Sequence, residues 1–174
     1  MRELDVKVIT ENIKEMCIEA THFLTEDMKN VLDDSVTKEE SPLGKQILQQ
    51  LQENLQIAGD EMIPICQDTG MAVLFVEYGE RVVIDGNFKE AVEEGVRRAY
   101  VGGYLRKSVV TDPVFDRVNT KDNTPAIIYT DIVEMTGAST ATISRVNRSL
   151  NYGCDGYELV FGRLEEEDKK EKED

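Results

Sequence analysis

The chain of 174 residues is long enough for one domain of ordinary size, and its 40% hydrophobic and 32% charged residues are typical of a globular protein. Its formal net charge of −15 argues against non-specific binding to nucleic acid, because such binding needs cations that replace the counterions of phosphate. The sequence shows no apolar signal region and no apolar run near the ~20 residues of a membrane span, which predicts a cytoplasmic protein without a membrane partner.

The first predicted element is an amphipathic helix over residues 10–24. Its apolar positions recur at helical spacing, and they are Ile9, Ile13, Met16, Cys17, Ala20 and Leu24. We expect Cys17 to be a small buried hydrophobic residue, since it lies on the apolar face. His22 falls between the apolar positions, so we expect it to face solvent.

Two further helices are predicted before residue 62. Thr25 can cap a helix that ends in the acidic stretch near residues 38–40. Ser41 and Pro42 are an N-cap hydroxyl followed by a proline at the first helical position, which indicates the start of the next helix. Its apolar stripe is Leu43, Ile47, Leu51, Leu55 and Ala58.

Strands enter in the second half of the sequence. Residues 71–76 read as a buried strand, and residues 81–84 are predicted to pair back on it as a hairpin. Asn87 is predicted to cap a fourth helix. Residues 106–125 are polar and rich in loop signals, so we expect loops there. Residues 126–132 are predicted to form a last strand. The predicted class is α+β: a helical N-terminal half, then short mixed strands and a helix, with an appended helical C-terminal segment.

Three segments carry the most specific residue pattern. They are Pro64-Ile65-Cys66-Gln67-Asp68-Thr69-Gly70, then Leu105 to Pro113, then the stretch holding Arg117-Val118-Asn119-Thr120 and Asp122-Asn123-Thr124-Pro125. With these segments, the chain resembles the class I (iron–sulfur) fumarate hydratases and the related tartrate dehydratase α subunit over about residues 1–133. The resemblance implies a hydro-lyase that adds water reversibly to fumarate to give L-malate.

The resemblance also implies site residues. Cys66 matches the first cluster ligand, and Gln67 and Asp68 match residues that contact the dicarboxylate, with Asp68 in the catalytic role. Arg106 matches a guanidinium that grips a substrate carboxylate. The matched motifs also contain Asp112, Arg117, Asn119, Asp122 and Asn123, to which we assign no role from the sequence.

The cofactor implied by the resemblance is a [4Fe–4S] cluster held by three cysteines, whose open iron acts as a Lewis acid. The sequence has three cysteines, but Cys17 and Cys154 do not match ligand positions, so one of the three expected ligands is present. We therefore expect a partner, either a β subunit or a second copy of the chain, and no activity of the chain alone.

Residues 134–164 resemble instead the DNA-reading part of the Trp-repressor-like family, with Ser139 as N-cap of a recognition helix. The residues that could reach a major groove are Thr140, Thr142, Arg145 and Asn147. Acidic and basic residues balance in this segment, which is a weak electrostatic footprint for DNA, so DNA is not an expected partner. Residues 165–174 are charged at every position and predict a solvated tail.

Three interpretations follow from these two resemblances. The chain is a portion of a hydro-lyase that needs a partner, a DNA-binding regulator that uses residues 136–152, or a non-functional fusion of two truncated genes. The sequence leaves fumarate and tartrate open as substrates.

Overall fold

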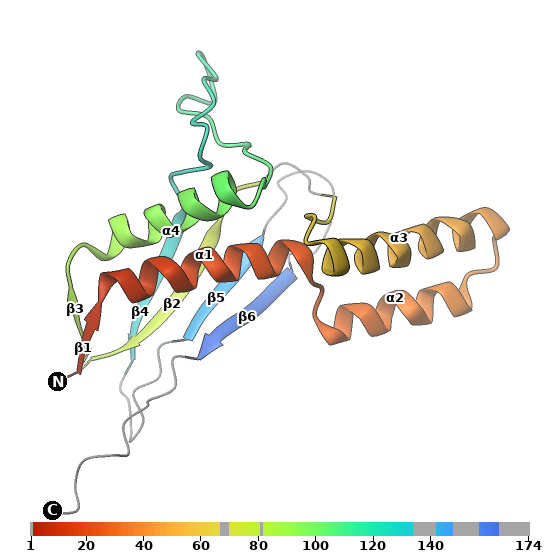
Figure 1. Ribbon diagram of the computed structural model, residues 1–174, viewed down its shortest axis with the longest axis horizontal. Coiled ribbons are helices and arrows are strands. Elements are labelled where there is room, and N and C mark those ends of the chain that lie inside the picture. The colour runs from red at the N-terminus through yellow and green to blue at the C-terminus, as the bar shows by residue number, and fades with distance from the viewer. Residues whose placement is uncertain (1, 67–69, 81, 134–141, 148–156, 164–174) are drawn as a thin grey trace, which may run out of the picture.

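The computed structural model describes residues 2–66, 70–80, 82–133, 142–147 and 157–163. The helices are α1 (Val6–His22), α2 (Glu26–Lys38), α3 (Pro42–Glu61) and α4 (Phe88–Gly102). The strands are β1 (Arg2–Asp5), β2 (Val73–Gly79), β3 (Val82–Asp85), β4 (Ile127–Val133), β5 (Thr142–Asn147) and β6 (Tyr157–Arg163). A helical N-terminal half followed by strands and a helix confirms the α+β class (Figure 1).

Helices α1 and α4 lie side by side over one face of the main sheet (Figure 1). The core between these layers contains Ile9, Ile13, Met16 and Cys17 of the apolar stripe predicted for the first helix, and Ile13 is fully buried. Ala20 and Leu24 of that stripe are only partly buried. Cys17 is 2% exposed, as expected. Burial of aliphatic side chains from both helices and from β2 is the main stabilising contribution to this arrangement.

The two helices are in close contact at Gly95 of α4. A Cβ at this position would lie 2.7 Å from the Thr10 carbonyl oxygen and 2.7 Å from the Ile13 Cβ. The Thr10 hydroxyl also donates to the Ala91 carbonyl oxygen at 3.0 Å, so a polar contact accompanies the apolar packing. Glycine is therefore required by space at this crossing.

The described strands of the main sheet have the order β4-β2-β5-β6. Strand β2 pairs with β4 in parallel, with Leu74 opposite Ile128 and Phe75 opposite Tyr129. Leu74 and Ile128 face the helices and join the core, whereas the rings of Phe75 and Tyr129 stack with centroids 4.9 Å apart. This parallel pair brings the residues that precede β2 and those that precede β4 to the same end of the sheet.

The hairpin predicted for residues 71–84 is wrong. Strand β3 pairs instead with β1 in parallel, with Arg2 opposite Val82 and Asp5 opposite Asp85. Parallel strands need a long crossover connection, and here α1, the α2–α3 pair and β2 lie between the two strands in sequence. The N-terminal residues thus form a small separate sheet.

Helices α2 and α3 form a hairpin that extends away from the sheet (Figure 1). Ser41 caps α3 as predicted, because its hydroxyl accepts from the Gly44 backbone N–H at 3.3 Å. The predicted apolar stripe exists on α3, but most of it is solvent-accessible: Leu43 is 66% exposed and Leu51 is 49% exposed. Among the described residues none of the helices is long and apolar enough to cross a bilayer.

The expected recognition helix is also wrong where the structure describes it. Thr142, Arg145 and Asn147 lie in strand β5, which pairs with β2 and with β6 in antiparallel fashion. A strand inside this sheet cannot place those residues as a helix in a major groove. Thr140 lies outside the described residues.

Candidate functional site

The turn that contains Cys66 begins at the end of α3. Met62 ends that helix in the left-handed conformation, with φ of 51°. The Ile65 backbone N–H then donates to the Thr21 carbonyl oxygen of α1 at 2.8 Å, which fixes the chain one residue before the cysteine. Cys66 follows as an exposed free thiol.

The chain leaves this turn at Gly70. Its carbonyl oxygen accepts a hydrogen bond from the Asn123 side chain, with Nδ2 and O 3.4 Å apart. Two residues later, the Ala72 carbonyl oxygen accepts from the Ile127 N–H at 2.9 Å, and β2 begins. The predicted site residues Gln67 and Asp68 lie between these two anchors, outside the described residues.

Asn123 also holds the segment that follows Arg106. Its Oδ1 accepts from the Ser108 N–H at 2.7 Å and from the Val109 N–H at 3.0 Å, and the residue is 0% exposed. Arg106 itself is exposed, while the preceding Leu105 is buried in the core. The segment that leads away from Cys66 and the segment that bears Arg106 therefore meet at one buried amide.

The other residues of the matched motifs shape the loop between α4 and β4, which projects from the body of the protein (Figure 1). Asp112 Oδ1 accepts from the Val114 and Phe115 backbone N–H groups at 2.8 and 3.0 Å. Asn119 Nδ2 donates to the Lys107 carbonyl oxygen at 3.0 Å. Arg117 Nε donates to the Pro113 carbonyl oxygen at 3.1 Å. These contacts close the loop on itself.

Asp122 connects this loop to α4. Its Oδ1 accepts from both the backbone N–H and the hydroxyl of Thr124, and its Oδ2 accepts from Arg97 Nε at 3.0 Å. Burial acts to raise the pKa of Asp122, but the hydrogen bonds from Thr124 and Arg97 outweigh it and hold the pKa below its usual value. Arg97 also forms an ion pair with Glu94 of α4, so it contacts two carboxylates. The carboxylate of Asp122 is thus structural rather than poised for proton transfer.

The donor set in the described residues does not fit an intact iron–sulfur cluster. Such a cluster needs several thiolates, and Cys66 is the one exposed cysteine in the described part of the chain. No group of three or more His, Cys, Asp or Glu side chains gathers as a metal site in the described ranges. Cys17 is buried in the core, away from solvent, and Cys154 lies outside those ranges.

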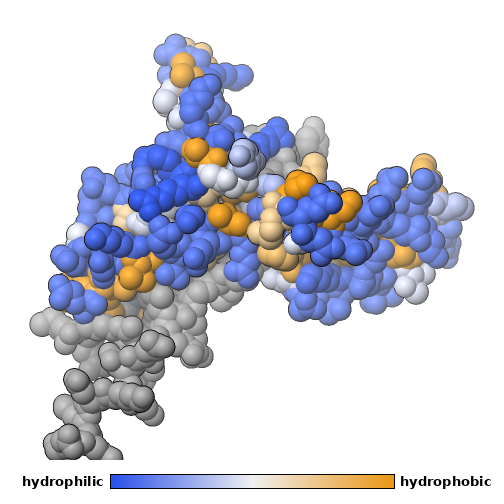
Figure 2. All heavy atoms as spheres, in the orientation of Figure 1, coloured by the Kyte–Doolittle hydropathy of each residue, from blue (hydrophilic) through white to orange (hydrophobic). Residues whose placement is uncertain are grey.

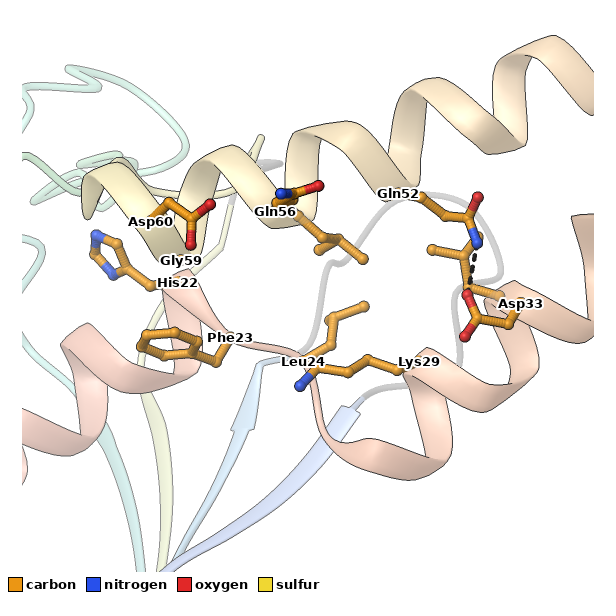
Figure 3. Close-up of a pocket in the computed structure, with 11 residues that line it drawn as sticks. His22, Phe23, Leu24, Lys29, Asp33, Gln52, Gln56, Gly59 and Asp60 are labelled. Atoms are coloured by element: carbon orange, nitrogen blue, oxygen red, sulfur yellow. Dashed lines mark hydrogen bonds between the residues drawn. The ribbon is translucent and has the colours of Figure 1, made fainter.

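A separate pocket of about 370 Å³ lies where the end of α1 meets α2 and α3 (Figure 3). Its walls include Phe23, Leu24 and Gln52, and Gln52 Nε2 donates to Asp33 Oδ1 at 2.5 Å. None of the described candidate residues Cys66, Arg106 and Asn123 lines it. This pocket does not belong to the predicted site.

His22 is buried at this junction and does not face solvent as we expected from its position between apolar residues. It is 2% exposed, and its Nδ1 lies 2.6 Å from the Ile18 carbonyl oxygen. Because a carbonyl can only accept, Nδ1 carries the proton. The approach of α3 to the end of α1 covers the ring, and helical periodicity within α1 alone does not reveal that contact (Figure 3).

The role of Asn123 in joining two segments was not predicted from the sequence. The sequence placed it in a matched motif, but a polar residue in a polar loop gives no periodic signal of burial. The available signal was the dipeptide Asp122-Asn123 close before a buried strand, since Asn and Asp adopt left-handed turns readily. Asn123 does have a positive φ, of 61°.

Comparison with known proteins gives the family. A family model described as Fumarate hydratase (Fumerase) matches residues 10–150, so the match extends beyond residue 133 and includes strand β5. A provisionally named L(+)-tartrate dehydratase subunit alpha of Methanocaldococcus jannaschii is 36% identical over 104 residues, which cover 59% of this chain and 36% of that protein. The L(+)-tartrate dehydratase subunit alpha of Escherichia coli K12 is 32% identical over 119 residues, 68% of this chain and 39% of that protein.

These names describe enzymes that add or remove water, which places the family among the hydro-lyases. The chain spans less than two fifths of the length of these curated relatives, as their covered shares of 36% and 39% state. The family match covers residues 10–150, well over half of the 174 residues. The chain therefore belongs to the fumarate hydratase (Fumerase) family.

Proposed function

We propose that this chain contributes part of the active site of a hydro-lyase that acts on a small dicarboxylate, such as the fumarate/malate pair or tartrate. The observation that carries the proposal is the meeting at Asn123 of the chain that leaves the Cys66 turn and the chain that bears Arg106. Arg106 and Cys66 are both exposed, which is consistent with contact to a soluble ligand.

Each residue has a distinct role in the proposal. The Arg106 guanidinium binds one substrate carboxylate, since two of its parallel N–H groups can donate to the two carboxylate oxygens. Gln67 hydrogen-bonds the substrate, and Asp68 takes or returns a proton at the hydroxyl that leaves or arrives as water. Cys66 offers one thiolate to the iron–sulfur cofactor of the family type.

One thiolate cannot hold a cluster, so the proposal needs thiolates beyond Cys66, from a β subunit or from further α-subunit sequence. The residues that lead into the turn support a partner: Met62 is 52% exposed and Ile63 is 50% exposed, four and three residues before Cys66. Hydrophobic surface gathers where α3 meets the body of the protein (Figure 2). The E. coli and M. jannaschii relatives carry the name subunit alpha, which favours a β subunit, or further α sequence, as the partner.

An anaerobic complementation assay tests the proposal. The purified chain, incubated with ferrous iron and sulfide, should hold less than one intact cluster per chain and should not convert fumarate to malate. Addition of the part of the E. coli relative that this chain does not match should give hydration of fumarate or dehydration of tartrate. Cys66→Ala and Arg106→Ala should each abolish the restored turnover.

Two results would count against the proposal. Turnover by the chain alone, lost in Cys66→Ala, would remove the need for a partner while leaving the hydro-lyase assignment intact. Absence of turnover in the complemented mixture, under conditions where the intact E. coli protein is active with its own partner, would overturn the assignment itself.

A further inference from the structure

We infer that Asn123 is the positioning residue that sets the Cys66 turn against the Arg106 segment, an inference that rests on the function proposed above for those two residues. Its side chain contacts both segments at once, through Nδ2 to the Gly70 carbonyl oxygen and through Oδ1 to the Ser108 and Val109 N–H groups. Gly70 is close in sequence to Cys66, and Ser108 is close to Arg106.

The chemistry of the position selects asparagine. One side chain must accept two backbone N–H groups and donate to one carbonyl, and a carboxamide has both functions on a single short stem. Its backbone must also hold φ near +61°, in the left-handed region that asparagine tolerates better than most residues. Asn123 is 0% exposed, so water does not replace a lost contact readily.

Asn123 can act as a reference point because its own backbone is fixed on both sides. On one side Asp122 is hydrogen-bonded to Arg97 of α4. On the other, Ala126 is buried and the Ile127 N–H donates to the Ala72 carbonyl oxygen as β4 pairs with β2. Through Asn123, the Cys66 turn and the Arg106 segment are therefore both held in place relative to helix α4 and the main sheet.

Positioning of this kind affects chemistry at a distance, since a displacement of ~1 Å of a reacting group can cost on the order of a hundredfold in rate. Loss of the Gly70 contact would free the end of the Cys66 turn, and loss of the Ser108 and Val109 contacts would free the Arg106 segment. These two effects are separable, because they depend on different atoms of Asn123.

Three variants separate the two effects. Asn123→Ala removes all three hydrogen bonds. Asn123→Asp keeps an acceptor for Ser108 and Val109 but removes the donor to Gly70. Asn119→Ala is the matched control, because it removes the contacts of Asn119 to Lys107 and Lys121 in the same loop without touching Gly70.

The first readout is hydrogen exchange of the Ser108 and Val109 amides. The second is the alkylation rate of Cys66 by iodoacetamide, read by peptide mass spectrometry over a pH series. The limiting alkylation rate at high pH reports access to the thiol, whereas the pH midpoint of the rate reports the local charge. The negative charge that Asn123→Asp introduces therefore affects the midpoint and can be told apart from a change in access. The third is protection of Cys66 from alkylation by L-tartrate.

Asn123→Ala should speed exchange of both amides about tenfold and raise the limiting Cys66 rate several-fold, as expected for loss of buried hydrogen bonds. Asn123→Asp should leave amide exchange near that of the wild type but raise the Cys66 rate like the alanine variant. Both should raise the half-protecting L-tartrate concentration about tenfold. Asn119→Ala should change neither the Cys66 rate nor the protection by L-tartrate.

A Cys66 rate unchanged in both Asn123 variants would overturn the inference and leave Asn123 as a structural residue of its loop. If Asn123→Ala fails to fold, the alkylation rate of Cys66 in Asn123→Asp tests the inference instead. If the Cys66 rate responds as expected but L-tartrate gives no protection even in the wild type, the positioning role stands and the proposed dicarboxylate site fails.

Discussion

Asp122 accepts a hydrogen bond from Arg97 Nε at 3.0 Å, and this contact ties the loop between α4 and β4 to helix α4, which packs against α1. The same carboxylate accepts from the Thr124 hydroxyl at 2.8 Å. Asp122 therefore holds the backbone on both sides of Asn123 through contacts that its carboxylate makes.

Asp122→Asn should lower the free energy of unfolding at neutral pH by about 1 kcal/mol, because it removes a charge-assisted contact to Arg97. The folded-state pKa of Asp122 lies below its ordinary value. Its contribution is therefore present above the unfolded pKa of about 4 and is lost as pH falls through the lower folded pKa.

Urea unfolding at pH values from about 7 down to about 3 checks this expectation. The difference between wild type and Asp122→Asn should shrink as the solution becomes acidic. Asp116→Asn, at an exposed position in the same loop, is the control. A difference that grows toward acid would contradict the assigned direction of the pKa.

Gly95→Ala should destabilise the protein by about 1–3 kcal/mol, because the new Cβ would collide with the Thr10 carbonyl oxygen and with Ile13. Gly102→Ala, in the same helix, meets no atom within 4 Å. It should be neutral or stabilising by up to about 1 kcal/mol, as alanine favours helix. Thermal unfolding of the two variants measures the contrast, and equal effects would mean that α1 and α4 are not in close contact at Gly95.

The exposed stripe of α3 should tolerate polar residues. Leu43→Gln and Leu51→Gln, at positions 66% and 49% exposed, should each change the free energy of unfolding by no more than about 0.5 kcal/mol. Leu74→Ala, at a position 2% exposed, should cost about 2–5 kcal/mol. Urea denaturation compares them, and a large loss at Leu43 would show that the hairpin packs against another surface.

The two described thiols should differ sharply in reactivity. Cys66 is exposed, whereas Cys17 is 2% exposed within the core. Under native conditions iodoacetamide should label Cys66 while Cys17 reacts only after unfolding, because alkylation requires access to the sulfur. Peptide mass spectrometry in the presence and absence of urea reads each site, and native labelling of Cys17 would contradict the packing of α1.

Features that depend on a few neighbouring residues, such as the buried face and the N-cap of a helix, were predicted correctly from the sequence. The stripe of Ile9 and Ile13 was identified correctly because a helix that covers a sheet must bury one face. The caps at Ser41 and Asn87 were also confirmed, since each side chain accepts from an N–H three residues later. These signals span a few residues and need no knowledge of the rest of the fold.

Contacts between distant segments were not predictable in this way. The pairing of β3 with β1 joins residues about eighty positions apart, whereas the short spacing of residues 71–76 and 81–84 pointed to a hairpin instead. Strand β5 shows a second limit: three of its six residues are Thr, Ile and Val, types that favour strands, but the motif resemblance outweighed this signal. The burial of Asn123 likewise depends on two segments that meet only in the folded chain.

The most direct test of the proposed dicarboxylate site is an amide NMR titration of the 174-residue chain with fumarate, L-malate and L-tartrate. We predict shifts concentrated at residues 65–72 and 105–109, for at least one of these ligands. Arg106→Gln should abolish them, whereas Arg117→Gln, in the projecting loop, should not. Shifts absent for all three dicarboxylates, or unchanged in Arg106→Gln, would contradict the claim that this chain binds a hydro-lyase substrate.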